Sequence, residues 1–476
     1  IEGDNLHALT ALTFTHEGKI DVMYFDPPYN TGSTDWKYNN DFVIKEDSFK
    51  HSKWLSFMCK RLNIAKKLLA TEGILVCTID ENEHAELGML LKDIFPDKDI
   101  VCVTIIHNPG GIQGKNFSYC HEYAYFVFPK YGIHINLEDR TDNPDIRPLR
   151  NVSKGAHLRA DAANCFYPIY VKNLEIIGFG NVCDDNFHPH SVNIFRDDGI
   201  LEIYPIDPKG IERKWVFARQ SVEEIKDELS VEWNKKRKAY DVIRGKTKFN
   251  YKTVWTDKKY NANLFGSQLI SEIIQTKFPF PKSLYAVIEC IKACVHPKNG
   301  LILDIFGGSG TTLHAVMSLN SMDGGNRQCI MVTNNENNIC EEVTYVRNQK
   351  VIQGYINLKG ETVPGLTNNN LRYYKCDFVP REPSLKNKRQ LTKSATDLLS
   401  IKENCYTDCT AEFISGYQSW IKLFSDDLSQ FLCIIYDDGK IEEAVIILKE
   451  LIDNKQPEKS VKVYVFSNGQ YPYTEE

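Results

Sequence analysis

Residues 20–32 read IDVMYFDPPYNTG, and this stretch decides how the rest of the chain is interpreted. The stretch 20–25, apolar at every position except Asp21, is typical of a buried strand, and it leads into Asp26, Pro27, Pro28 and Tyr29. Proline, asparagine and glycine are ordinary turn residues, so a plain strand end is the simplest interpretation. The turn also offers a carboxylate, a backbone carbonyl fixed by proline and an aromatic face, which together could grip a nucleobase.

The composition limits the function classes that remain. A chain of 476 residues, 42% hydrophobic and 25% charged, predicts a globular protein of two to four domains. We find no apolar run near 18 residues and no secretory leader, so we expect neither a membrane span nor export. The fourteen cysteines include only two close pairs, both C-x₃-C, and no His cluster completes a zinc set. We therefore expect free thiols in a reducing cytoplasm and no metal site.

The chain is acidic as a whole but contains one strongly basic stretch. The net charge of −6 argues against indiscriminate nucleic-acid binding, yet residues 235–259 hold ten Lys or Arg against two Asp, with aromatic residues between them. A charge run is often only a solvated face, but this mixture favours contact with a polyanion. The candidates for DNA contact are Lys235, Lys236, Arg237, Lys238, Arg244, Lys246 and Lys248.

Strand and helix patterns divide the chain into four segments. Apolar strands alternate with amphipathic helices over residues 1–130 and again over 263–375, which predicts a mostly parallel sheet covered on both faces. Residues 131–262 break this rhythm, with short strands and one charged helix expected over 221–243. Residues 376–476 predict a linker, centred on 381–390, followed by a small α/β module.

A glycine-rich loop follows the strand in LILDIFGGSGTTLHAV, residues 301–316. A phosphate loop would need Lys after Gly310, and a dinucleotide fingerprint would need Gly at position 313, where this chain has Leu. S-adenosylmethionine (AdoMet) fits better, because a glycine backbone and a helix N-terminus can approach its methionine carboxylate. Asp304 could accept from its ammonium, and Glu336 could bind its ribose.

DPPY together with FGGSGTT resembles the beta group of DNA amino-methyltransferases, and DPPYNTG and ILVCTIDENE look most like modification subunits of type III restriction–modification systems. The resemblance implies an α/β fold: a Rossmann-like seven-stranded AdoMet-dependent methyltransferase sheet. It also implies circular order, with the catalytic half (1–130) before the AdoMet-binding half (263–375). The insert (131–262) would be the target-recognition domain, and the module within 376–476 would dock a partner or dimerise. The implied cofactor-binding residues are Asp4, Asn5, Leu6, Lys282, Asp304, Phe306, Gly307, Gly308, Gly310, Thr311 and Glu336.

The resemblance also implies the chemistry of the DPPY turn. Asp26 and the Pro27 carbonyl would accept hydrogen bonds from an exocyclic amino group, while Tyr29 stacks on a base flipped out of the duplex. Asp at position 26 favours adenine N6, and the chain has no Pro-Cys dipeptide for covalent methylation of a ring carbon. An N4-cytosine enzyme of the same architecture stays open, as does a DNA-recognition or assembly subunit whose methyl transfer is vestigial. The expected partners are double-stranded DNA, a second copy of the chain and a separate restriction subunit, in a prokaryotic cytoplasm.

Overall fold

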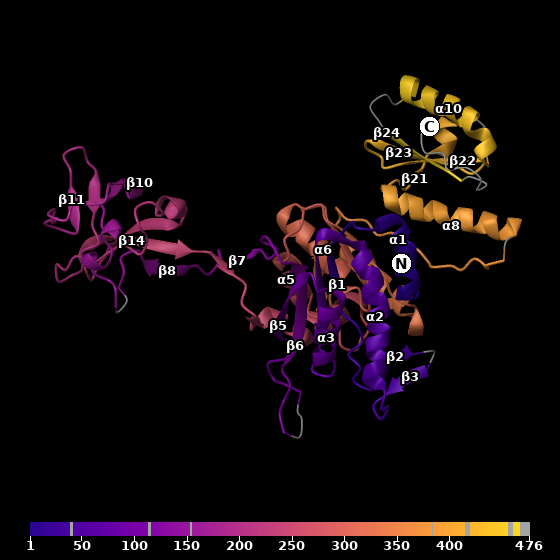
Figure 1. Cartoon of the computed structure of the whole chain (residues 1–476), viewed down its shortest axis with the longest axis horizontal. Helices are drawn as coiled ribbons and strands as arrows, with labels where there is room; N and C mark the ends of the chain where they lie inside the picture. The colour runs from indigo at the N-terminus through magenta and orange to yellow at the C-terminus, as the bar shows by residue number, and fades with distance from the viewer. Residues whose placement is uncertain are drawn as a thin grey trace. The chain divides into compact units, whose positions relative to one another are not determined.

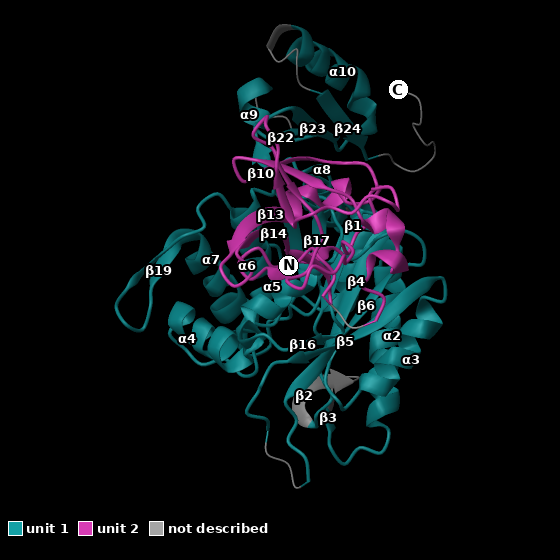
Figure 2. Ribbon diagram, turned by 90° about the vertical axis from the view of Figure 1, so that its left-hand side faces the viewer, with its two compact units in different colours: residues 1–135, 252–476 teal, residues 136–251 magenta. Residues whose placement is uncertain are grey.

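The computed structural model divides the chain into two compact units, which Figure 2 colours separately. Residues 1–135 and 252–476 form unit 1, and residues 136–251 form unit 2. The structure describes residues 1–38, 41–112, 116–152, 155–382, 384–414, 419–455 and 460–466, so the end of the predicted C-terminal module, 467–476, lies outside the described residues.

Unit 1 is built on a seven-stranded sheet with the strand order β16-β5-β6-β4-β1-β17-β18. Every neighbouring pair is parallel except that β6 runs antiparallel to both β4 and β5. The predicted α/β fold with a mostly parallel sheet is therefore confirmed. In sheet order the strands are β16 (Val254–Trp255), β5 (Lys98–Ile106), β6 (His121–Pro129), β4 (Leu69–Ile79), β1 (Ile20–Phe25), β17 (Leu301–Asp304) and β18 (Gln328–Met331).

Helices cover the sheet because its central strands are apolar on both faces. Alternate residues of β1, Met23 and Phe25, pack in one core with α1 (Asn5–His16), α2 (Lys50–Leu68) and α3 (His84–Ile94). Figure 1 shows α2 and α3 side by side along the sheet. Val22 and Tyr24 of β1 are also buried, and α5 (Leu284–Ala293) contacts this strand and packs against α6 (Thr311–Asp323).

The register of β1 and β17 places the two decisive motifs next to each other. Val22 is opposite Ile302 and Met23 is opposite Leu303, in parallel. Both strands therefore end at the same edge of the sheet, with the DPPY turn after one and the glycine loop after the other. Ligands of open α/β sheets bind at such carboxyl ends, where the connections that follow two neighbouring strands run to opposite faces of the sheet.

Smaller elements complete this part of unit 1. Two hairpins, β2–β3 and β19–β20, form separate two-stranded sheets, and short helical segments join the main elements. Their bounds are β2 (Ser33–Tyr38), β3 (Asp41–Ile44), η4 (Lys258–Tyr260), η5 (Asn263–Gln268), α4 (Leu269–Ile274), η6 (Glu336–Asn338), η7 (Ile339–Tyr345), α7 (Val346–Gln353), β19 (Gly354–Ile356) and β20 (Thr362–Pro364).

The C-terminal part of unit 1 has its own four-stranded sheet in the order β21-β22-β23-β24. The expected linker at 381–390 is wrong from residue 385 onward, because helix α8 begins there. The Ser384 side chain caps this helix by accepting from the Asn387 amide, and the Lys, Arg and Gln residues that follow are good helix formers. The elements are α8 (Leu385–Glu403), β21 (Thr407–Asp408), α9 (Thr410–Phe413), β22 (Ile421–Ser425), β23 (Gln430–Ile435), η8 (Asp438–Lys440), α10 (Ile441–Glu450), η9 (Leu451–Lys455) and β24 (Ser460–Val465).

Unit 2 consists of short antiparallel strands around an apolar core that contains Tyr167, Ile169 and Trp215. Its sheets have the orders β10-β9-β12-β11, β13-β14-β8 and β15-β7. The elements are β7 (Leu137–Asp139), β8 (Asp145–Pro148), η1 (Arg159–Asp161), η2 (Ala163–Cys165), β9 (Ile169–Lys172), β10 (Glu175–Phe179), β11 (Asn193–Phe195), β12 (Leu201–Ile203), η3 (Glu223–Glu228), β13 (Leu229–Asn234), β14 (Ala239–Lys246) and β15 (Lys248–Asn250).

The charged helix expected over 221–243 is wrong. Only η3 is helical there, and β13 and β14 form a hairpin in which Leu229 pairs with Arg244 and Asn234 with Ala239. Buried Val231 and Val242 face the core of unit 2, so tertiary packing outweighs the helix preference of Glu and Lys.

The boundaries of unit 2 also differ from those of the predicted insert, 131–262. The structure assigns residues 131–135 and 252–262 to unit 1, because β16 pairs in parallel with β5 of the central sheet. Among the described residues, no helix has the length and apolar character that crossing a bilayer would require.

Candidate active site

The DPPY turn presents Asp26 at the edge of the sheet. The Thr78 hydroxyl, at the end of β4, donates to Asp26 Oδ1 at 2.7 Å. The Trp54 indole donates to the Pro28 carbonyl at 2.7 Å and so fixes the far side of the turn. No described residue donates to the Pro27 carbonyl. The turn is thus held at Asp26 and Pro28, and the Pro27 carbonyl oxygen keeps its capacity to accept.

Asn30 ends this turn in an unusual backbone conformation. Its φ of 59° lies in the left-handed region, which asparagine tolerates better than most residues, and its side chain is fully buried. The Asn30 amide donates to Glu83 Oε1 and, at 3.3 Å, to the Lys50 carbonyl. His51 Nδ1 lies 2.7 Å from the same Glu83 oxygen. Glu83, from the loop after β4, therefore joins the DPPY turn to the start of α2.

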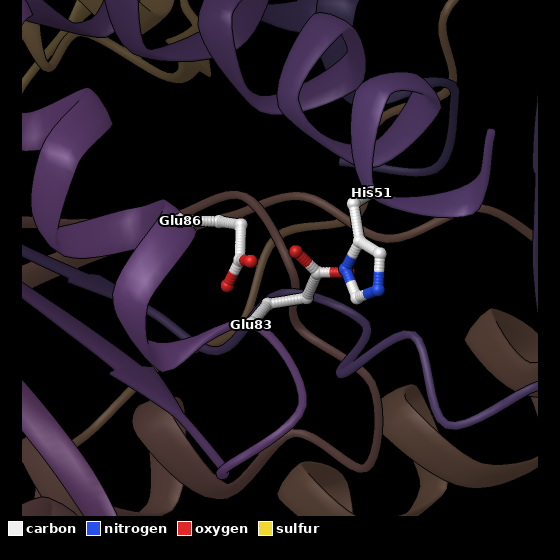
Figure 3. A group of neighbouring side chains, drawn as sticks. All are labelled: His51, Glu83 and Glu86. Atoms are coloured by element: carbon white, nitrogen blue, oxygen red, sulfur yellow. The ribbon is translucent and has the colours of Figure 1, made fainter.

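Figure 3 shows Glu83 between His51 and Glu86. The three side chains offer ligand atoms within 4.8 Å of one another, a spacing that could suit a metal ion. However, His51 and Asn30 already engage Glu83 directly, so a cation would have to replace hydrogen bonds that hold the turn. Burial raises the pKa of Glu83, and its Oε2 has no hydrogen-bond partner within the described residues. We interpret the cluster as an anchor for Asn30.

A lysine and a second carboxylate complete the area around Asp26. Lys282 Nζ lies 3.2 Å from Asp26 Oδ1 and also donates to Glu122 Oε2 and to the Tyr29 hydroxyl. The Tyr29 hydroxyl donates to Glu122 at 3.1 Å, and the ammonium lies 4.2 Å from the centroid of the Tyr29 ring. Burial disfavours the charged Glu122, but Lys282 outweighs it and lowers the pKa of Glu122. Likewise, Asp26 and Glu122 overcome burial and raise the pKa of Lys282.

The glycine loop begins at Asp304, which is almost fully buried. Its Oδ1 accepts from the Phe306 amide at 2.8 Å, and its Oδ2 accepts from the Thr312 hydroxyl at 2.6 Å. Burial, with a smaller contribution from the charge of Asp26, raises the pKa of Asp304 to about 7. Asp304 would therefore gain from a cationic partner in the pocket, which would favour its charged form.

Two glycines of the loop have no room for a side chain. A Cβ at Gly307 would lie 2.6 Å from the side chain of Met331, and one at Gly310 would lie 2.4 Å from that of Asn348. Gly310 also has a φ of +77°, immediately before α6 begins. The loop backbone can therefore approach a ligand while it packs against the elements behind it.

Arg347, on α7, supports the loop from behind and was not predicted from the sequence. It is fully buried and donates to the Ser309 carbonyl at 3.2 Å and to the Thr311 hydroxyl at 2.7 Å. Burial lowers the pKa of Arg347 to about 9. Glu122 was missed as well, although a single carboxylate inside the apolar strand HEYAYFVF was the available signal.

One pocket joins the turn and the loop. It has a volume of about 110 Å³, and Asp26, Asp304 and Lys282 all line it. The other lining residues are Tyr24, Phe278, Phe280, Pro281, Val287, Phe306, Gly307, Gly308, Ser309, Thr311 and Thr312. The structure thus brings together seven of the predicted site residues, which come from segments far apart in the chain.

The other predicted cofactor residues lie outside that pocket's lining. Asp4 is exposed and caps α1 by accepting from the amides of Leu6 and His7. Asn5 donates to the Ile305 carbonyl at 3.1 Å and accepts from Arg61 Nε at 2.5 Å, so it ties α1 to the glycine loop. Glu336 is exposed beyond β18. Their roles in cofactor binding stay predictions.

The predicted DNA-binding residues lie in unit 2 and differ in exposure. Lys235, Lys236 and Lys238 are exposed in the turn between β13 and β14, and Lys248 is exposed on β15. Arg237 is largely buried and pairs with Asp241.

The two remaining candidates have partners within unit 2. Arg244 pairs with Glu228 at 2.5 Å, and the Lys246 ammonium lies 4.8 Å from the centroid of the Phe249 ring. The exposed lysines are thus better placed than either arginine to contact a polyanion.

Comparisons with known proteins match the larger part of the chain. A family model described as DNA methylase matches residues 20–344. The type II methyltransferase M.KpnI of Klebsiella pneumoniae is 30% identical over 70% of this chain and 79% of its own length. The type III restriction-modification enzyme EcoPI Mod subunit of Escherichia phage P1 is 26% identical over 71% of this chain and 57% of its own length. The chain thus spans little more than half of that Mod subunit.

Solved structures give weaker matches. The M1.HpyAVI–SAM complex aligns with 73% of this chain and 98% of its own, with 11% identity and a TM-score of 0.35. The PvuII DNA methyltransferase (cytosine-N4-specific) covers 73% of this chain and 83% of its own, with 10% identity and a TM-score of 0.34.

Proposed function

Because this chain belongs to the DNA methylase family, we propose that it is a site-specific DNA methyltransferase that methylates adenine N6 with AdoMet as the donor. One observation carries the proposal: Asp26 of the DPPY turn and the glycine loop line the same pocket, at the ends of adjacent parallel strands. Direct transfer requires the methyl donor and the amino acceptor to lie next to each other, as two ligands in one pocket would.

The residues of the glycine loop fit the methionine end of AdoMet. The backbone of Gly307 and Gly308 lines the pocket, and Asp304 offers a buried carboxylate to an ammonium group. The N-terminus of α6 begins at Thr311 and directs unpaired amides toward a ligand carboxylate. When bound, AdoMet supplies an activated methyl group on its sulfonium.

The DPPY turn supplies what the amino acceptor needs. The lone pair of an exocyclic adenine nitrogen is delocalised into the ring, so this nitrogen is a poor nucleophile. Hydrogen bonds from its two N–H groups to Asp26 and to the Pro27 carbonyl would draw the nitrogen toward tetrahedral geometry and free the lone pair. Tyr29 would stack on the flipped base, whose extrusion costs a few kcal/mol.

Unit 2 is our candidate for target recognition. The exposed lysines of the β13–β14 turn would contact phosphates, which position a protein on DNA but do not specify a sequence. Because Mod subunits are among its relatives, we also propose a restriction–modification context, with a separate restriction subunit as partner and a dimer as the working form.

The test is to express the wild type and Asp26→Ala in a host without DNA methylation and to sequence the DNA by a modification-sensitive single-molecule method. We expect one motif to carry N6-methyladenine with the wild type and none with Asp26→Ala. N4-methylcytosine would instead assign the chain to the cytosine-directed alternative. Unmodified DNA from soluble, AdoMet-binding wild type would refute the proposal for this chain alone and favour the vestigial alternative or a missing partner.

A further inference from the structure

The Lys282 ammonium occupies a place that the target base would also need. Its Nζ lies 3.2 Å from Asp26 Oδ1 and 4.2 Å from the centroid of the Tyr29 ring. Under the proposed function, on which this inference rests, Asp26 accepts from the target amino group and Tyr29 stacks on the base. A single side-chain amine therefore already contacts both groups.

Glu122 gives this ammonium a second partner. The carboxylate comes from β6, its side chain is 6% exposed, and its Oε2 accepts from both Lys282 and the Tyr29 hydroxyl. A neutral amino group cannot displace an ammonium from a carboxylate unless the ammonium has another anion to pair with. Glu122 is that anion, and it needs no long movement of Lys282 because the two already touch.

We propose that Lys282 is a placeholder for the exocyclic amino group of the target base, and that Glu122 is the positioning residue that takes the ammonium when the base enters. Insertion of the base moves Lys282 off Asp26 and away from the Tyr29 ring. Asp26 can then accept from the target N–H. The Tyr29 hydroxyl stays on Glu122, so the ring keeps its orientation while its face becomes available.

This arrangement predicts that Glu122 matters mainly while Lys282 is present. Glu122→Gln removes the alternative partner, so Lys282 stays on Asp26 and opposes insertion of the base. We expect the methyl-transfer kcat/KM to fall by about tenfold or more, as for contacting charged groups. In the double variant Glu122→Gln/Lys282→Met the placeholder is gone, and most of this loss should be recovered.

The experiment uses the full chain and a duplex that carries the methylated motif, with 2-aminopurine in place of the target adenine. Its fluorescence rises when the base leaves the stack and so reports insertion separately from methyl transfer. Methyl transfer is measured on the unmodified duplex at saturating AdoMet, and AdoMet binding and thermal unfolding are measured for every variant. Glu81→Gln, at a nearby exposed carboxylate, is the matched control and should behave as the wild type.

The outcomes separate this inference from the proposed function. Loss of both signals in Glu122→Gln with recovery in the double variant supports the placeholder. A double variant as impaired as Glu122→Gln, with intact AdoMet binding, overturns it and assigns Lys282 a direct role in the reaction. If Glu122→Gln does not fold, Lys282→Met alone decides: insertion equal to or above the wild type supports the placeholder, and reduced insertion refutes it. Wild type that transfers no methyl group refutes the proposed function itself.

Discussion

Asp26 and Asp304 are two carboxylates that line one pocket but have different partners. Asp26 faces Lys282 and the Thr78 hydroxyl, while Asp304 is buried against Thr312 and the Phe306 amide. Asp26 can therefore accept from the amino group that receives the methyl, while Asp304 can pair with the ammonium of the methyl donor. Both side chains are the same carboxylate, so the difference between their roles comes from their burial and their neighbours.

AdoMet affinity should depend on pH through Asp304. Burial raises the pKa of Asp304 to about 7, and only its ionised form can pair with an ammonium. Since the ionised fraction increases as pH rises through 7, we expect binding to tighten about tenfold between pH 6 and pH 8. Calorimetric titration at several pH values measures this. Asp304→Asn should bind more weakly and keep only the pH dependence that the ligand's own amino group causes; equal pH dependence in both proteins would refute the assignment.

Asn30 anchors the DPPY turn, so its replacement should affect stability and methyl transfer more than cofactor binding. Asn30→Ala places a less tolerant residue at a φ of 59° and leaves the buried Glu83 with fewer hydrogen bonds. We expect a loss of about 2–4 kcal/mol in unfolding free energy, from backbone strain and the unsatisfied carboxylate together. Asn30→Gly removes only the hydrogen bonds and should lose less. Denaturant unfolding and methyl-transfer assays check both; full activity in Asn30→Ala would show that the anchor is dispensable.

At the scale of elements, α7 positions the glycine loop through a single side chain. The first helical turn of α6 carries Thr311, and Arg347 of α7 reaches it and the Ser309 carbonyl from the buried side. The loop that would hold AdoMet is therefore fixed by two helices, and only one of them follows the loop directly in the sequence.

Removing Arg347 should loosen the loop. Arg347→Met keeps much of the buried volume but leaves the Ser309 carbonyl without its donor, at about 1–3 kcal/mol, and leaves the Thr311 hydroxyl with its bond to the Ser309 hydroxyl. We expect a lower melting temperature and weaker AdoMet binding, whereas Arg147→Met, at an exposed ion pair with Asp145 in unit 2, serves as the control. Unchanged AdoMet affinity in Arg347→Met would contradict this role.

The strands and helices differ in how well the sequence predicts them. The strands of the central sheet were predictable because short, mostly apolar stretches such as 20–25, bounded by turn residues and alternating with amphipathic helices, are typical of a buried parallel sheet. The stretch 221–243 was not, since its charged residues favour a helix locally while the alternation of Leu229, Val231 and Trp233 fits a strand. The partnership of Lys282 and Glu122 could not be predicted either, because it depends on the approach of segments 160 residues apart.

At the scale of the whole chain, unit 2 is inserted through two neighbouring strands. β7 and β15 pair antiparallel, with Leu137 opposite Asn250, so the two ends of unit 2 lie beside each other. Opposite residues of such a pair are only about 5 Å apart at their Cα atoms. The chain can therefore leave unit 1 and return to it at nearly the same point.

Unit 1 should fold without unit 2. Replacing residues 137–250 by a linker of about three Gly and Ser residues bridges the gap without strain. We expect the shortened chain to bind AdoMet with unchanged affinity but to lose site-specific methylation, as sequencing of host DNA would detect. A shortened chain that is insoluble, or that no longer binds AdoMet, would show that unit 1 depends on unit 2 for its fold.

Electrostatic contact with DNA should come from the turn between β13 and β14. Exposed Lys235, Lys236 and Lys238 each release about one counterion when they meet a phosphate, so replacing all three by Ala should reduce the slope of log K against log salt concentration by about 2–3. AdoMet binding should not change. The matched control replaces Lys386, Lys388 and Lys393, three exposed lysines of α8, and should leave the slope as it is. Equal slopes for the two triple variants would move the DNA contact away from this turn.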